Sequence, residues 1–137
     1  MIRIYDGNLK GDCPSEAVEQ INSAGWLELH HPDDWALAFH VPNEIKASPQ
    51  YMAKRRKMGV KSGPSDWIIA RSPVGAFEMK RQVKSKSRVS PEQIAFLEAV
   101  DASGGFAAIC YGVEQFKLAY SDYQVYCASI AATKAAN

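Results

Sequence analysis

Short apolar runs of strand length alternate along this chain with segments of helical periodicity, and this alternation constrains the fold more than any other feature. Strands are predicted over residues 26–30, 35–40, 66–71, 76–80 and 106–111. Helices are predicted over residues 14–24, 49–58, 91–103 and 113–120, followed by a weakly helical tail. Strands interleaved with helices indicate an α/β domain with a central mixed β-sheet flanked by helices.

Local sequence signals place several of these boundaries. Ser48-Pro49 and Ser90-Pro91 each combine an N-cap residue with a proline at the first helical position. Gln93 follows Ser90 by three residues, which is the spacing of a capping box. The segment Ser72-Pro73-Val74-Gly75 is a turn by composition, so we expect the strands on either side of it to pair as a hairpin.

The length of the chain, 137 residues, is that of a single domain, and we expect a core over about residues 14–120 with a tail over residues 121–137. No apolar run approaches the roughly 18 residues of a membrane span, and the N-terminus lacks the apolar segment of a signal peptide. Cys13, Cys110 and Cys127 show no C-x-x-C spacing, which argues against a zinc site. These features predict reduced thiols and a cytoplasmic location.

The formal net charge is only +1, but the charges are segregated along the chain. Residues 45–90 carry 12 basic and 2 acidic residues, whereas residues 1–44 carry 2 and 8, and residues 91–137 carry 2 and 5. A solvated basic surface would account for this pattern. The middle third is nevertheless as basic as a nucleic-acid-binding module, so the pattern favours a polyanionic partner.

The only acidic residues of this basic third, Asp66 and Glu78, lie on the two strands of the predicted hairpin. Glu78 and Lys80 are two residues apart and therefore point to the same face of a strand. Two carboxylates can hold Mg²⁺ or Mn²⁺, with phosphate and water completing the coordination. Lys80 would then orient an attacking water or stabilise charge developing on the phosphate. An ordinary set of cross-strand ion pairs is the alternative interpretation.

The segment Gly63-Pro64-Ser65-Asp66, followed by Glu78-Met79-Lys80, resembles the motif of the PD-(D/E)XK nuclease superfamily. The flanking segments, 39–44 before the basic helix and 90–97 after the basic loop, narrow this likeness. Their order and spacing are similar to the VRR-NUC family, the virus-type replication and repair nucleases, over roughly residues 14–115. One departure is that Pro64 stands two residues before Asp66 instead of directly before it.

The resemblance implies a restriction-endonuclease-like fold and hydrolysis of DNA phosphodiester bonds with Mg²⁺ or Mn²⁺ as the cofactor. It makes Asp66 and Glu78 metal ligands, joined by the backbone carbonyl of Met79, and it makes Lys80 the catalytic lysine. Gln93 matches the family's glutamine at the start of the following helix.

The family's N-terminal helix also supplies a glutamate to the metal, and either Glu16 or Glu19 fits that position. Asn43 matches an asparagine that precedes the basic helix in the family. The histidines lack the spacing of metal ligands and are expected to be structural or exposed, although a DNA-phosphate contact is an alternative for His40. The candidates for contacts with the DNA backbone are Lys54, Arg55, Arg56, Lys57, Lys61, Lys84, Lys86 and Arg88.

The leading hypothesis is a metal-dependent, structure-specific DNA endonuclease. By the resemblance, it would act as a homodimer on branched DNA, such as four-way (Holliday) junctions, in a bacterial or phage-infected cell. The alternatives are a flap or nicking nuclease of the same family, an RNA-directed nuclease, and a non-catalytic DNA-binding module. The presence of Asp66, Glu78 and Lys80 together favours an enzyme over the non-catalytic module.

Overall fold

A five-stranded mixed sheet forms the centre of the computed structural model, which describes residues 1–42 and 46–137. The strands are β1 (Arg3–Tyr5), β2 (Ala38–His40), β3 (Trp67–Ile69), β4 (Gly75–Lys80) and β5 (Phe106–Tyr111). Their order across the sheet is β1-β5-β4-β3-β2. β5 runs parallel to β1 and β4, whereas β3 pairs antiparallel with β2 and β4. The mixed sheet and the β3–β4 hairpin predicted from the sequence are therefore confirmed.

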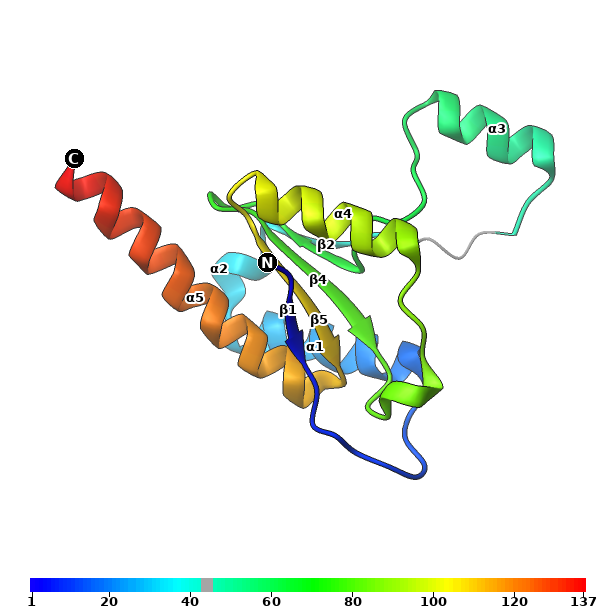
Figure 1. Cartoon of the computed structure of the whole chain (residues 1–137), viewed down its shortest axis with the longest axis horizontal. Coiled ribbons are helices and arrows are strands. Elements are labelled where there is room, and N and C mark those ends of the chain that lie inside the picture. The colour runs from blue at the N-terminus through cyan, green and yellow to red at the C-terminus, as the bar shows by residue number, and fades with distance from the viewer. Residues whose placement is uncertain (43–45) are drawn as a thin grey trace.

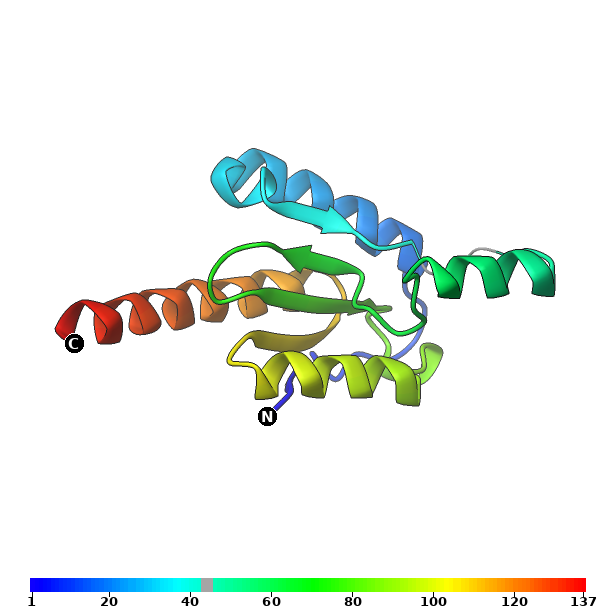
Figure 2. The ribbon, with the colours of Figure 1, turned by 90° about the horizontal axis from the view of Figure 1, so that it is seen from above.

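Helices cover both faces of this sheet. They are α1 (Glu16–His30), α2 (Pro32–Trp35), α3 (Pro49–Lys57), α4 (Pro91–Ala102) and α5 (Val113–Ala136), with a short 3₁₀ helix, η1 (Lys84–Lys86). α1 and α5 pack on one face and α4 packs on the other (Figures 1 and 2). Figure 1 shows α3 standing away from the sheet on its connecting segments. None of the helices among the described residues is long and apolar enough to cross a membrane.

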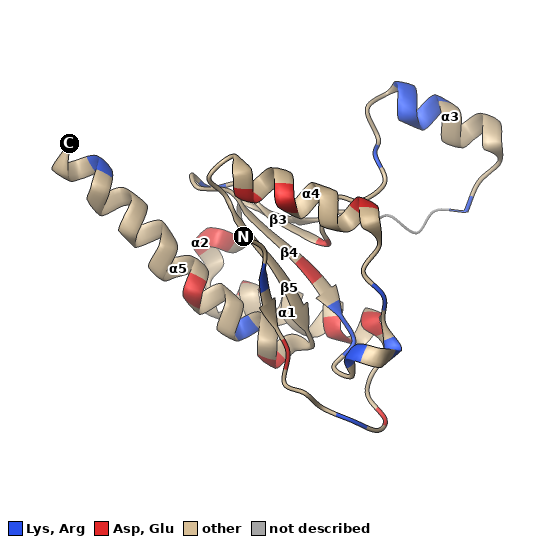
Figure 3. Cartoon of the chain, in the orientation of Figure 1, with Lys and Arg blue, Asp and Glu red and all other residues tan. Residues whose placement is uncertain are grey.

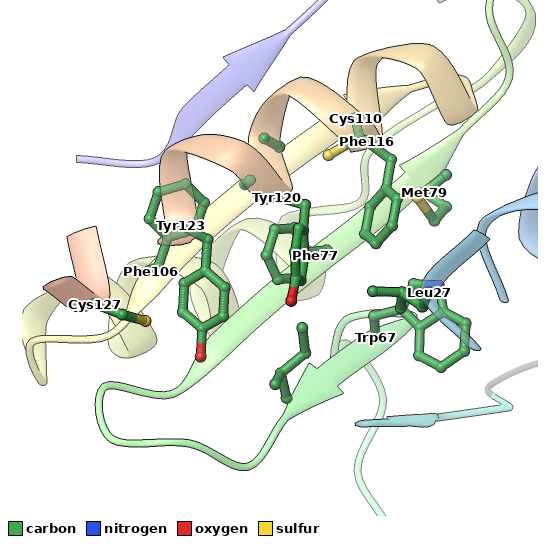
Figure 4. Close-up of a cluster of buried hydrophobic side chains, with 13 residues drawn as sticks. Leu27, Trp67, Phe77, Met79, Phe106, Cys110, Phe116, Tyr120, Tyr123 and Cys127 are labelled. Carbon is green, nitrogen blue, oxygen red and sulfur yellow. The ribbon is translucent and has the colours of Figure 1, made fainter. Parts of the chain in front are cut away.

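Side chains of β4 point alternately to the two faces of the sheet. This alternation places Phe77 and Met79 on one face and Glu78 and Lys80 on the other. Phe77 and Met79 are fully buried in the larger cluster, against side chains of α1, β5 and α5 (Figure 4). Ala76 lies in the smaller cluster, beneath α4. Glu78 and Lys80 share the face of Ala76 because side chains alternate along a strand. They lie at the end of β4 that is near the start of α4.

Several predicted elements differ from the observed ones. Residues 26–30 are not a strand, because α1 continues through Gly25 to His30. Glu19, Ser23 and Leu27 are buried at four-residue intervals, as one face of a helix requires, and a Cβ at Gly25 would meet nothing within 4 Å. Gly25 thus faces open space and does not end the helix.

At the C-terminus, α5 extends to Ala136 instead of ending near residue 120. Tyr123 and Cys127 are buried on the core side of this extension, and tertiary packing therefore stabilises a segment of weak helical pattern. β1, a strand of three residues at the edge of the sheet, was not predicted. β2 begins at Ala38, three residues after the predicted start, because Pro32–Trp35 forms the short helix α2.

Candidate active site

The hairpin brings the three motif residues together at one end of the sheet. Asp66 directly precedes β3, and its Oδ2 atom accepts a hydrogen bond from the backbone N–H of Met79 at 2.7 Å. That bond holds the aspartate against β4, between the two residues that flank Met79. The Lys80 Nζ atom lies 3.6 Å from Oε1 of Glu78. Both side chains are almost fully buried, with 1% of Glu78 and 4% of Lys80 exposed.

The first turn of α1 adds a third carboxylate to this group. Carboxylate oxygens of Glu16, Asp66 and Glu78 all lie within 4.8 Å of one another. Lys80 Nζ is also 4.0 Å from Oε1 of Glu16, so a single ammonium group stands between two acids. Ser15 caps α1 by accepting a hydrogen bond from the backbone N–H of Val18, which fixes where the helix starts and hence where Glu16 lies.

Glu19, the rival candidate on the same helix, serves a different part of the fold. Its carboxylate accepts hydrogen bonds from Nε2 of Gln82 at 3.1 Å and from the backbone N–H of Val113 at 2.6 Å. Val113 is the first residue of α5, where a negative charge is favourable. The structure therefore places Glu16 in the cluster with Asp66 and Glu78, whereas Glu19 binds the first residue of α5.

Gln93 holds Glu78 in place from the start of α4. Its Nε2 donates to Oε1 of Glu78 at 2.8 Å, while its Oε1 accepts from the backbone N–H of Ser90 at 2.8 Å. The second bond belongs to the capping box of α4, which the sequence predicted. The capping box at the start of α4 therefore fixes the side chain of Gln93, which in turn holds the carboxylate of Glu78.

Burial raises the pKa of Glu78 from its ordinary value of 4.5 to about 9. The negative charge of Asp66 is the next largest cause, and Lys80 only partly opposes it. Three carboxylates near one buried position repel one another unless a cation or a proton compensates them. The electrostatics of the site therefore favour a positive charge in addition to that of Lys80.

One oxygen atom indicates that this charge can be a metal ion. Among the residues that the structure describes, Oε2 of Glu78 is buried without a hydrogen-bond partner. Its other oxygen is taken by Gln93 and Lys80. An orphaned buried carboxylate oxygen is costly, and a hard divalent cation prefers oxygen ligands of this kind. The donor set of Glu16, Asp66 and Glu78 fits Mg²⁺ or Mn²⁺.

These groups line a cavity of about 630 Å³ that also includes residues the motif does not contain. Ala17, Gln20 and Ile21 of α1 contribute to it, as do His40 and Pro42 from the other side. The helical periodicity of α1 could have indicated Gln20, which lies one turn after Glu16. Nothing in the sequence shows that His40 comes beside Asp66.

The chain contacts the site both before α3, at Val41, and after it, at Gly63. The backbone oxygen of Asp66 accepts hydrogen bonds from the N–H of Val41 and from Nδ1 of His40, each at 2.9 Å. After α3, Gly63 has a φ of +101°, and a Cβ there would lie 2.6 Å from the backbone oxygen of Glu92. Only glycine permits this close approach, which seats the segment before Asp66 on the start of α4.

The basic candidates do not line the cavity and form two groups along the chain (Figure 3), and all of them except the half-buried Arg55 are exposed. One group occupies α3 and the segment after it, and it consists of Lys54, Arg55, Arg56, Lys57 and Lys61. The other lies at η1 and just beyond it, and it consists of Lys84, Lys86 and Arg88. No helix position in α3 is buried, so its charges are available to a partner. Asn43 lies outside the described residues.

Gln93→Ala is expected to reduce any metal-dependent activity of the site by about 10- to 100-fold, the usual scale for a residue that orients a ligand. It should also cost about 1 kcal/mol of stability through loss of the cap. Ser90→Ala is the matched control, because it removes the Ser90 hydroxyl that caps the Gln93 N–H but leaves Gln93 beside Glu78. Equal activity losses in the two variants would contradict a positioning role for Gln93. Thermal denaturation and metal titration would be measured on both.

Comparisons with known proteins support the fold. No protein-family profile and no curated protein matches the sequence. A solved structure described as a VRR_NUC domain protein is similar to this chain with a TM-score of 0.68 and 21% sequence identity. The likeness covers 84% of this chain and 92% of that one. The chain therefore has the fold of a VRR_NUC domain protein, and the expected restriction-endonuclease-like α/β fold is confirmed.

Proposed function

We propose that this chain is a divalent-metal-dependent DNA endonuclease that hydrolyses phosphodiester bonds in branched DNA, such as four-way junctions, as a homodimer. One observation carries the proposal: Glu16, Asp66 and Glu78 converge within 4.8 Å beside a buried lysine. The fold supports it, because a VRR_NUC domain protein has the same architecture. Its expected place of action is the cytoplasm of a bacterial or phage-infected cell.

In this proposal Glu16, Asp66 and Glu78 hold Mg²⁺ or Mn²⁺, and the backbone carbonyl of Met79 is a further ligand. The bound ion would lower the pKa of water and stabilise charge on the phosphate. Gln93 keeps Oε1 of Glu78 occupied, which leaves Oε2 for coordination. Lys80 is held by Glu78 and Glu16 with its ammonium group in the cavity, where it orients the attacking water or neutralises the phosphate.

The two basic groups suit a sequence-independent hold on the DNA backbone. Lys54 to Lys57 are consecutive on α3, and a phosphate-binding surface needs exposed charges more than a particular geometry. Lys84 and Lys86 lie in η1, just beyond the end of β4 and well apart from α3 (Figure 1). DNA in contact with both groups would pass the cavity between them. Such contacts predict affinity that falls steeply as salt concentration rises.

The experiment that tests this function is a cleavage panel. Duplex, flap, splayed-arm and four-way-junction DNA would be incubated with the protein in Mg²⁺, in Mn²⁺ and in EDTA. We expect cuts in the branched substrates, most in the junction, and none in EDTA. The absence of metal-dependent cleavage on every substrate would reject the enzyme and leave a DNA-binding module. Light scattering with and without junction DNA would give the mass, and a monomer in both conditions would reject the two-site arrangement.

A further inference from the structure

The cavity is lined by the almost fully buried Glu78 and Lys80 and also by apolar side chains. Glu78 and Lys80 have almost no exposed surface, so a phosphate must enter the cavity to reach them. Ala17 and Ile21 of α1 form an apolar wall of the cavity, and Ile21 is 69% exposed. An apolar wall contributes nothing to the binding of a charged phosphate group. The wall therefore suits a part of the substrate that is itself flat and weakly polar.

His40, which also lines the cavity, has a ring held in a fixed orientation. Nδ1 of His40 donates to the backbone oxygen of Asp66 at 2.9 Å, because a carbonyl oxygen can only accept. The ring also contacts Trp67, with 6.1 Å between the centroids. His40 remains exposed, and Pro42 lies beside it on the cavity wall. Histidine rings are among the surfaces on which unstacked nucleobases pack.

One residue that lines the cavity has a hydrogen-bond donor without an acceptor among the described residues. Gln20 lines the cavity one helical turn after Glu16, and its Nε2 atom is buried with no partner among the described residues. An unsatisfied buried amide is costly. Each of the four DNA bases carries at least one ring-nitrogen or carbonyl acceptor, and a single donor can therefore serve them all without reading sequence.

We propose that this cavity seats one unpaired nucleotide next to the scissile phosphate, with its base between Ile21 and His40 and within reach of the Gln20 amide. The inference rests on the proposed nuclease function and names its substrate class more closely. A volume of about 630 Å³ is in the range that holds a drug-sized ligand. A paired base stays in its stack, whereas an unpaired or mismatched base enters at the lowest energetic cost. Flap and splayed-arm DNA present unpaired nucleotides at the branch point, whereas a four-way junction must first open a base pair there.

Cleavage kinetics test this inference with two duplexes of identical sequence, one fully paired and one with a single mismatched pair at the cut. Wild-type protein is expected to cut the mismatched duplex about tenfold faster or more, the scale of one base contact. Ile21→Ala should lose most of that preference. Leu29→Ala is the matched control, because Leu29 is a 76% exposed residue of the same helix that does not line the cavity. Equal rates on both duplexes would overturn the inference while leaving the nuclease function intact.

A binding measurement decides the inference even if no substrate is cut. Tetrathymidylate and an abasic tetranucleotide carry the same phosphates, but only the first carries bases. With Ca²⁺ present, we expect tetrathymidylate to shift the NMR signals of the Gln20 side-chain amide and the His40 ring, and the abasic chain to leave them unchanged. Equal shifts with both chains, or none with either at saturation, would overturn the base-binding cavity.

Discussion

Lys80→Ala protein is expected to lose metal-dependent cleavage by about 10²- to 10³-fold, the scale observed when one group that stabilises transition-state charge is removed. Its affinity for Mn²⁺ should be unchanged or higher. Lys80 Nζ lies 3.6 Å from Glu78 and 4.0 Å from Glu16, so its removal takes away a positive charge that competes with the metal for these acids. Single-turnover cleavage and calorimetric titration of Mn²⁺ measure the two quantities separately.

Asp66→Asn is the matched variant for this prediction. The asparagine side-chain oxygen can still accept the hydrogen bond from the Met79 N–H, so the hairpin should remain folded. It lacks the charge that a metal ligand needs, and both Mn²⁺ affinity and cleavage should fall, while salt-sensitive DNA binding persists. Asp33→Asn, at an exposed position of α2, controls for loss of one negative charge. Wild-type cleavage by Lys80→Ala, or unchanged Mn²⁺ affinity in Asp66→Asn, would contradict the assigned roles.

Where the sequence carried a local signal, the fold could be predicted. The capping box of Ser90 and Gln93 and the turn before Gly75 are short-range patterns, and the elements they bound form as expected. Gly25 is also a local signal, but the helix around it is decided by the packing of Leu27 against the sheet. β1 has three residues, and pairing with β5 from the far end of the chain makes it a strand. Pairing between segments so far apart in the chain produces no periodic pattern in the sequence of either segment.

The residues of the candidate site could likewise be predicted only where local spacing in the sequence places them. Glu78 and Lys80 share a face because they are two residues apart, which is a local fact, and the hairpin adds Asp66. The choice between Glu16 and Glu19 could not be made, because either spacing is compatible with a helix beside the strand. It depends on Gln82 and on the start of α5, which reach Glu19 only in the folded chain. Gln93 matches the family's glutamine, and its hydrogen bond to Glu78 depends on how α4 packs beside β4 in the folded chain.

Glu78→Gln is expected to stabilise the metal-free protein at neutral and alkaline pH while removing activity. The pKa of Glu78 is about 9 in the folded protein and near 4.5 when the group is free, so the folded protein keeps a proton that the unfolded chain releases. Stability from this group is therefore fully present below about pH 4.5 and is lost progressively as pH rises toward 9. Glutamine is neutral at every pH, and its oxygen can still accept the bond from Gln93.

Thermal denaturation in EDTA from pH 5 to pH 9 would measure this difference. Wild-type protein should lose stability over that interval, whereas Glu78→Gln should change less and be more stable at pH 8 by roughly 1–3 kcal/mol, the scale of an unsatisfied buried polar group. Glu98→Gln, at an exposed position of α4, is the control and should follow the wild type. Mg²⁺ or Mn²⁺ should stabilise the wild type and Glu98→Gln more than Glu78→Gln, because the neutral side chain at position 78 weakens binding. Parallel pH curves for wild type and Glu78→Gln would contradict the idea that the folded site holds one carboxylate ready to exchange its proton for a metal ion.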